Sequence, residues 1–127
     1  MTKRAQSLIV IAEKDLSHAT DVLRTHPQHA AFSAQQAAEK LMKAVLEREG
    51  VSYPSTTHQL FELVSLIPKT NPFRADLMPL GPLTTAATKY RYPTPRGEAP
   101  EDPDPDEIEN DLARIRRLLP EIKAWLR

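Results

Sequence analysis

The residues of this chain best suited to bind a phosphate surround Arg91, in the run Lys89-Tyr90-Arg91-Tyr92-Pro93. A guanidinium group offers a planar fork of donors that matches phosphate oxygens, and Arg91 is predicted at a helix end beside a loop. Tyr92 is a further candidate, because an exposed tyrosine ring can stack on a nucleic-acid base. The alternative is that Arg91 only complements the last carbonyl groups of its helix, while Tyr90 continues an apolar stripe into the core.

A second set of polar side chains follows one face of the stretch Ser33–Gly50. Glu39 and Lys43 lie one helical turn apart, and Gln36 falls on the same side. An ordinary helix pair of this kind stabilises a protein by roughly 0.2–0.5 kcal/mol and needs no other role. The functional interpretation instead places Lys43 on a phosphate, with Glu39 orienting Arg91 or a sugar hydroxyl and Gln36 on the same site.

His58 is the last candidate for the site, at the start of a predicted short helix. Helix capping or an interhelical hydrogen bond is the alternative role for this side chain. The four histidines are scattered, and the acidic stretch 98–107 lacks the spacing of metal ligands. The sequence therefore predicts neither a metal site nor a cofactor.

Length and composition bound the class of protein. The 127 residues are enough for one domain, predicted to span residues 1–127. The 17 basic and 17 acidic side chains give a formal net charge of +0, which argues against a globally basic nucleic-acid binder or a membrane-surface protein. The absence of cysteine excludes disulfides and thiolate chemistry. We expect a cytoplasmic protein, because the apolar runs are too short for a membrane span or a signal peptide.

Hydrophobic spacing predicts the helices that position these residues. Apolar side chains recur three and four residues apart in five stretches: Arg4–Arg24, Ser33–Gly50, His58–Leu66, Pro82–Arg91 and Asp106–Arg127. The second stretch is rich in alanine, so neighbouring helices can approach it closely, and it is predicted to be the central helix. No alternating pattern of a strand occurs. The expected fold is an all-α, up-and-down bundle of four main helices plus one short helix.

Proline, glycine and acidic residues predict where the helices begin and end. Gly50 is expected to cap the central helix, and Asp104 to cap the start of the last one, with Pro105 in its first turn. Pro120 is expected to kink the last helix. Residues 93–105 form a Pro-rich, acidic stretch with no large aliphatic side chain, so we expect an extended loop before the last helix.

Three segments in order resemble the HEPN domain family. They are SAQQAAEKLMKAVLEREG at residues 33–50, Thr57-His58-Gln59-Leu60, and the helix end that carries Arg91-Tyr92-Pro93. The resemblance spans most of the chain and implies a small helical bundle that binds a nucleotide and forms a homodimer. It also implies a minimal nucleotidyltransferase partner, as in toxin–antitoxin pairs. Some branches of the family are metal-independent ribonucleases.

The ribonuclease branch carries an arginine followed after four to six residues by a histidine near the helix that ends at Arg91. This chain has no histidine after Arg91, and the matching spacing of Arg24 and His29 falls in the first interhelical loop. The sequence thus favours a nucleotide-binding module over an enzyme. A ribonuclease toxin that takes its acid–base from elsewhere, either His58 or a residue across a dimer interface, is one alternative, although nothing in the sequence supports RNA binding. A non-catalytic adaptor that binds a partner protein is the other.

Overall fold

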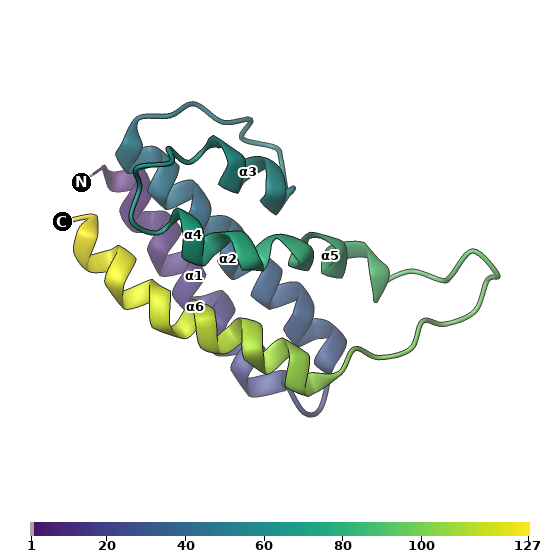
Figure 1. Ribbon diagram of the computed structural model, residues 1–127. Helices are drawn as coiled ribbons and strands as arrows, with labels where there is room; N and C mark the ends of the chain where they lie inside the picture. The colour runs from purple at the N-terminus through teal and green to yellow at the C-terminus, as the bar shows by residue number, and fades with distance from the viewer. Residues whose placement is uncertain (1) are drawn as a thin grey trace.

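Three long helices and a string of short ones make up the chain. The computed structural model describes residues 2–127, apart from the side chain of Ala87. The elements in order are α1 (Lys3–Val22), α2 (Pro27–Glu49), α3 (Leu60–Leu66), α4 (Arg74–Leu77), the 3-10 helix η1 (Met78–Thr85), α5 (Ala86–Lys89) and α6 (Pro105–Trp125). The long helices lie side by side, with α1 and α2 antiparallel, and residues 2–127 contain no strand (Figure 1). The predicted all-α bundle is confirmed.

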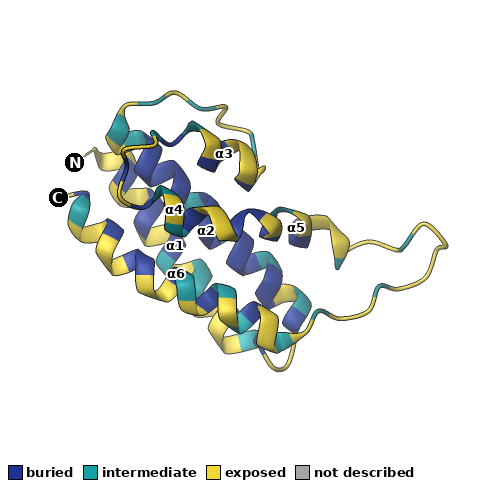
Figure 2. Ribbon diagram, viewed as in Figure 1, coloured by how far each residue is buried: buried dark blue, intermediate teal, exposed yellow. Residues whose placement is uncertain are grey.

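The second helix is the centre of the bundle. Its buried side chains face several neighbours at once, and five of its alanines have no exposed surface: Ala30, Ala34, Ala37, Ala38 and Ala44 (Figure 2). Because these side chains are short, α1 packs closely along the length of α2. The helix begins at Pro27, six residues before the predicted Ser33, since proline fits the first turn of a helix. It ends as predicted at Gly50, whose φ of 69° is left-handed and whose N–H bonds the last turn.

The last helix packs along α1 and α2. Asp104 caps it as predicted, because its carboxylate accepts a hydrogen bond from the Asp106 N–H at 2.9 Å. Pro120 was expected to kink the last helix, and α6 is one continuous helix through it to Trp125. Pro120 is exposed on the outer side of α6. The carbonyl group that loses its helical partner there therefore faces water, which reduces the cost of the missing hydrogen bond.

The segment Pro82–Arg91 differs from its prediction as one regular helix. The structure has the 3-10 helix η1 followed by the single turn α5, and Tyr90 lies in a turn, partly buried against the core. Pro82 has no N–H to donate, and the Leu60 N–H donates to the Thr84 hydroxyl at 2.9 Å, which fixes η1 to the start of α3. Arg91 therefore follows a tight turn, where its N–H donates to the Thr88 carbonyl at 3.2 Å.

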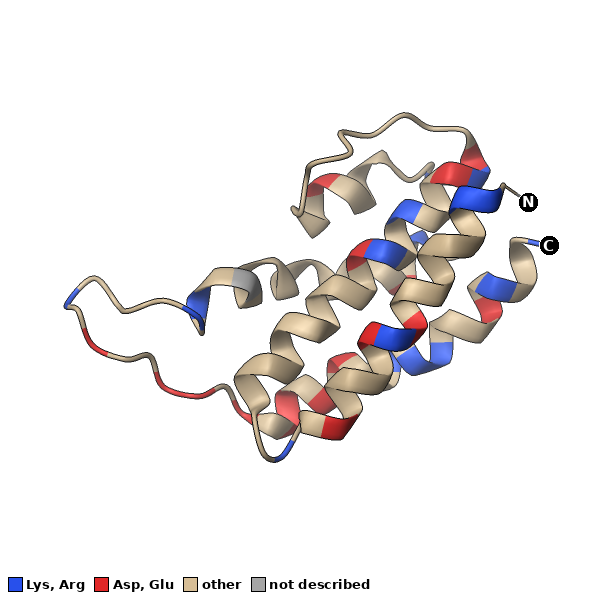
Figure 3. Cartoon of the chain, turned by 180° about the vertical axis from the view of Figure 1, so that it is seen from behind, with Lys and Arg blue, Asp and Glu red and all other residues tan. Residues whose placement is uncertain are grey.

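A long loop connects this turn to α6 and extends away from the bundle, as expected for residues 93–105 (Figure 1). Acidic side chains follow its second half toward α6 (Figure 3): Glu98, Glu101, Asp102 and Asp104. The two chain termini lie together at the opposite end of the bundle.

Gly81 provides a test of how η1 packs on α3. A methyl group at this position would overlap the ring of Phe61. We expect Gly81→Ala to lower the free energy of unfolding by about 1 kcal/mol, because an overpacked contact must open. In a Phe61→Ala background the same change should raise the free energy by roughly 0.5 kcal/mol, since alanine is the better helix former. Urea unfolding of the four proteins measures both effects, and an equal cost in both backgrounds would contradict this packing.

Candidate functional site

A cleft of about 630 Å³ opens between α2, the segment before α3 and the η1–α5 strip. We call it the α2–α5 cleft. Its lining contains one guanidinium group, one imidazole, two amides, three threonine hydroxyls and one phenyl ring, contributed by Arg91, His58, Gln36, Gln59, Thr84, Thr85, Thr88 and Phe32. Three of the six predicted site residues, Gln36, His58 and Arg91, thus lie around one space that a small polar ligand can enter.

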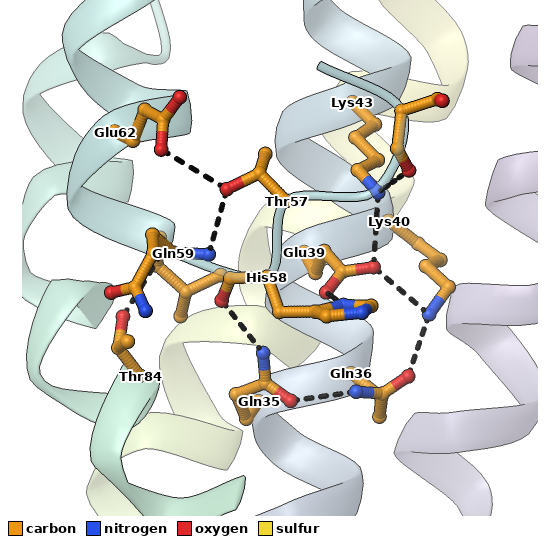
Figure 4. Close-up of polar contacts among 12 residues, drawn as sticks. Gln35, Gln36, Glu39, Lys40, Lys43, Thr57, His58, Gln59, Glu62 and Thr84 are labelled. Carbon is orange, nitrogen blue, oxygen red and sulfur yellow. Dashed lines mark hydrogen bonds and ion pairs between the residues drawn. The ribbon is translucent and has the colours of Figure 1, made fainter. Parts of the chain in front are cut away.

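A buried carboxylate anchors one end of this cleft. The Glu39 side chain is only 2% exposed, and its Oε1 lies 2.7 Å from His58 Nδ1 (Figure 4). Its other oxygen, Oε2, lies 3.2 Å from the Lys43 ammonium group and 3.3 Å from that of Lys40. Both oxygens therefore have charged or strongly polar partners, which a carboxylate in the interior requires.

The surroundings of Glu39 decide its charge and the tautomer of His58. Burial raises the pKa of Glu39, but the hydrogen bond to His58 and the charges of Lys40 and Lys43 hold this pKa below its ordinary value of 4.5. Glu39 is therefore ionised at neutral pH and can only accept hydrogen bonds. It follows that His58 Nδ1 carries a hydrogen and donates it. In the neutral ring, the lone pair then belongs to Nε2.

Lys43 is held inside the bundle. Its side chain is 7% exposed, and its ammonium group donates to Glu39 and to the Ser55 carbonyl oxygen at 3.3 Å. The same group lies 5.9 Å from the centre of the Tyr53 ring. Lys43 is not among the side chains that line the α2–α5 cleft. Lys43 is therefore a counter-charge to Glu39 and does not border the cleft.

Arg91 forms the other end of the cleft. Its guanidinium group stacks on the Phe32 ring, 4.3 Å from the ring centre, and the side chain remains exposed. Tyr92 is 60% exposed but does not line the cleft, although it follows Arg91 directly. The stacking holds the guanidinium plane while its N–H edges stay available to a ligand.

The backbone that carries His58 is fixed by side chains from two helices. Gln35, which is fully buried, donates to the His58 carbonyl oxygen at 3.2 Å and accepts from Gln36 at 2.7 Å. On the other side, the hydroxyl of Thr57 accepts from the Gln59 N–H and bonds Glu62 (Figure 4). Hydrogen bonds thus fix both the imidazole ring and the backbone of His58.

Several residues of the cleft were missed by the sequence analysis. Phe32 precedes the stretch that was assigned to the central helix, yet it lies four residues before Gln36 and seven before Glu39. That spacing places all three on one helical face, so the periodicity could have identified it. Gln35 and the threonines of η1 and α5 carry no such signal, because their roles depend on contacts between distant segments.

The fold and the cleft together define an all-α bundle domain built around one buried central helix with a polar site on its flank. The sequence pattern of the HEPN domain matches residues 5–125, and the chain therefore belongs to the HEPN domain family. The crystal structure of an archaeal HEPN homologue is similar over 99% of this chain and 100% of that chain, with a TM-score of 0.65 and 22% sequence identity. This likeness shows a shared fold. No curated protein sequence matches the chain significantly.

The described part of the chain has neither a membrane-spanning helix nor a cluster of metal-binding side chains. Within residues 2–127, none of the helices combines the length and hydrophobicity that a membrane span needs. The same residues contain no group of three or more histidine, aspartate or glutamate side chains placed to hold a metal ion.

The buried carboxylate should make stability depend on pH in a defined window. Glu39→Gln leaves the Lys43 charge without its partner, so we expect a loss of about 3 kcal/mol of unfolding free energy at pH 7. The folded-state pKa of Glu39 lies below 4.5, so its contribution is complete above pH 4.5 and is lost as pH falls through the folded value. Urea unfolding should show a constant difference in unfolding free energy between wild type and variant from pH 7 down to pH 4.5. Between pH 4.5 and pH 3 this difference should shrink.

Glu98 in the exposed loop provides the matched control for this measurement. Glu98→Gln removes a carboxylate of the same type from a solvated position, so its unfolding curves should follow wild type at every pH. A Glu39→Gln difference that persists undiminished to pH 3, or that is already absent at pH 7, would contradict the role assigned to this carboxylate.

Proposed function

We propose that this chain is a nucleotide-binding module whose ligand lies along the α2–α5 cleft. The observation that carries the proposal is the placement of two different anchors on one face of α2. Arg91 stands on Phe32, and His58 stands on Glu39, seven residues further along the helix. At 1.5 Å per residue, Phe32 and Glu39 lie about 10 Å apart along α2, a spacing that a nucleoside with one phosphate can span.

In this arrangement Arg91 binds the phosphate and the other end of the cleft holds the nucleoside. The Arg91 guanidinium group is exposed and carries a full positive charge, whereas both ammonium groups near the other end already share Glu39. The hydroxyl and amide groups between the anchors offer neutral donors and acceptors for a sugar and a base. Tyr92 lies next to Arg91 and is exposed, so its ring is available to stack on a base.

Glu39 and Lys43 support the ligand indirectly in this proposal. Glu39 orients the His58 imidazole, and Lys43 balances the buried negative charge. Gln36 lies between the anchors and bonds both Gln35 and Lys40. Its amide retains one unused N–H and one unused lone pair on the oxygen for the ligand.

We also propose that the domain acts as a homodimer together with a minimal nucleotidyltransferase-type protein, as in toxin–antitoxin pairs. Membership of the HEPN domain family supports this part, since such pairing is typical of the family. Light scattering during size-exclusion chromatography tests the dimer, and a mass near the 14.3 kDa of one chain would contradict it. Mixing with the candidate partner should then shift the complex to a larger mass.

Nucleotide binding predicts a stabilisation that depends on Arg91. A ligand at about a hundredfold its Kd adds roughly 2.7 kcal/mol to the free energy of unfolding, which raises Tm by several degrees. We expect such a shift with one member of a panel of nucleoside mono-, di- and triphosphates. Arg91→Ala should reduce the affinity for that nucleotide about tenfold or more, because a charge-assisted contact to phosphate is lost. Thermal unfolding across the panel measures both effects.

Arg96, an exposed arginine of the long loop, is the matched control for Arg91. Arg96→Ala removes the same charge from the chain but no group from the cleft, so the nucleotide shift should be retained. A panel without any shift would contradict nucleotide binding. A shift that survives Arg91→Ala would instead contradict the position of the phosphate.

The ribonuclease alternative is supported by one observation, the presence of His58 and Arg91 in the same cleft. His58 would accept the proton of a 2′-hydroxyl group, and Arg91 would stabilise the phosphate charge. Incubation of the purified protein with RNA in EDTA tests this alternative. Cleavage that disappears in His58→Gln would favour it over a binding module, and intact RNA would exclude it.

A further inference from the structure

His58 combines two features that rarely occur together in one side chain. The imidazole is 65% exposed, yet its Nδ1 is fixed at 2.7 Å to a carboxylate that is 2% exposed. The other three histidines, His18, His26 and His29, are also exposed, and within residues 2–127 none of them pairs with a carboxylate. The nucleotide-binding proposal uses the contact with Glu39 only to orient the ring.

The hydrogen bond to Glu39 prepares His58 for nucleophilic attack. Because Nδ1 carries the shared hydrogen, the lone pair of the neutral ring is on Nε2, the nitrogen that is not bonded to the protein. When Nε2 forms a bond, positive charge develops on the ring, and the Glu39 carboxylate stabilises that charge without moving. A nucleophile oriented by a base or by a fixed partner is the arrangement that covalent catalysis uses.

The charges around His58 favour an anionic reagent. Lys40 and Lys43 both lie on the second oxygen of Glu39, so they balance the charge of this carboxylate together with that of Asp15, which interacts with Lys40 and Glu39. Arg91 adds a positive charge at the far end of the cleft. A phosphoryl donor, which carries negative charge, is thus attracted toward this face of α2.

The remaining lining limits the kind of donor. Apart from His58 and Arg91, the cleft is lined by amides, threonine hydroxyls and a phenyl ring, none of which releases a proton near neutral pH. A donor that leaves as an alkoxide would need such a proton. The anhydride of a phosphate and a carboxylic acid does not, because its leaving group is a carboxylate and is stable as an anion.

We propose that His58 is a phosphoryl-accepting site that reacts with acyl phosphates. In the step, the Nε2 lone pair forms a bond to phosphorus, and the bond between phosphorus and the acyl oxygen breaks. The carboxylate leaves with that electron pair. The hydrogen on Nδ1 stays in the hydrogen bond to Glu39, and no oxidant, reductant or external proton is needed. This inference does not depend on the nucleotide-binding proposal.

The test uses the wild-type chain and acetyl phosphate as the donor. The protein is incubated at neutral pH and kept above acidic pH during digestion, because phosphohistidine is acid-labile. Mass spectrometry of the peptides then gives the rate of phosphorylation at each of the four histidines. We expect His58 to react about tenfold faster or more than His18, His26 and His29, which serve as internal controls in the same chain. Similar rates at all four histidines would overturn the proposal.

Two variants test the roles of Glu39 and His58, and one spectroscopic measurement identifies the nitrogen that is phosphorylated. Glu39→Gln should slow the labelling of His58 to the rate of the other histidines, measured at a temperature where circular dichroism shows the variant to be folded. His58→Gln should abolish the fast labelling. Phosphorus NMR of the wild-type product should assign the phosphoryl group to Nε2. Attachment to Nδ1, or faster release of phosphate with no labelled His58, would contradict the accepting role.

Discussion

The structure depends on the requirement that the buried carboxylate of Glu39 be compensated. An ionised side chain that is 2% exposed is stable only if every lone pair finds a donor and its charge is balanced nearby. Lys40 and Lys43 come from the same helix, but His58 comes from a segment nineteen residues further along the chain. The Ser55 carbonyl oxygen then satisfies Lys43 in turn. One buried charge thus ties the connection between α2 and α3 to the central helix.

The rest of the bundle makes this buried charge possible. The alanines of α2 are buried and let α1 pack closely, so the polar side chains of the helix gather on one face. That face carries Glu39 and Lys43, which the segment before α3 contacts through Ser55 and His58. It is bordered by the η1–α5 strip, which ends in a tight turn and leaves Arg91 beside Phe32. The cleft therefore depends on the irregular geometry of the η1–α5 strip. A straight helix from Pro82 would direct Arg91 elsewhere.

The parts of the fold that could be predicted from the sequence are those that local chemistry decides. The spacing of apolar residues predicted the long helices, and Gly50 and Asp104 predicted the caps of two of them. The 3-10 geometry of η1 could not be predicted in the same way, because it depends on the bond between Leu60 and Thr84 across twenty-four residues. Pro120 shows the converse, since α6 continues through this unfavourable residue on its exposed side.

The candidate site shows the same division at the level of single side chains. Sequence periodicity placed Glu39 and Lys43 on one face but could not tell which nearby cation would be neutralised and which would remain free. Burial decides this: Lys43 is enclosed with its counter-ion, whereas Arg91 rests on an aromatic ring that leaves its charge exposed. The two ends of the cleft therefore differ. One end carries the exposed positive charge of Arg91, and the other carries the His58 imidazole with its hydrogen bond to a carboxylate. Arg91 contacts Phe32 and His58 contacts Glu39, so two side chains of α2 help to set the positions of both groups. Any ligand that contacts both groups must match the distance between them.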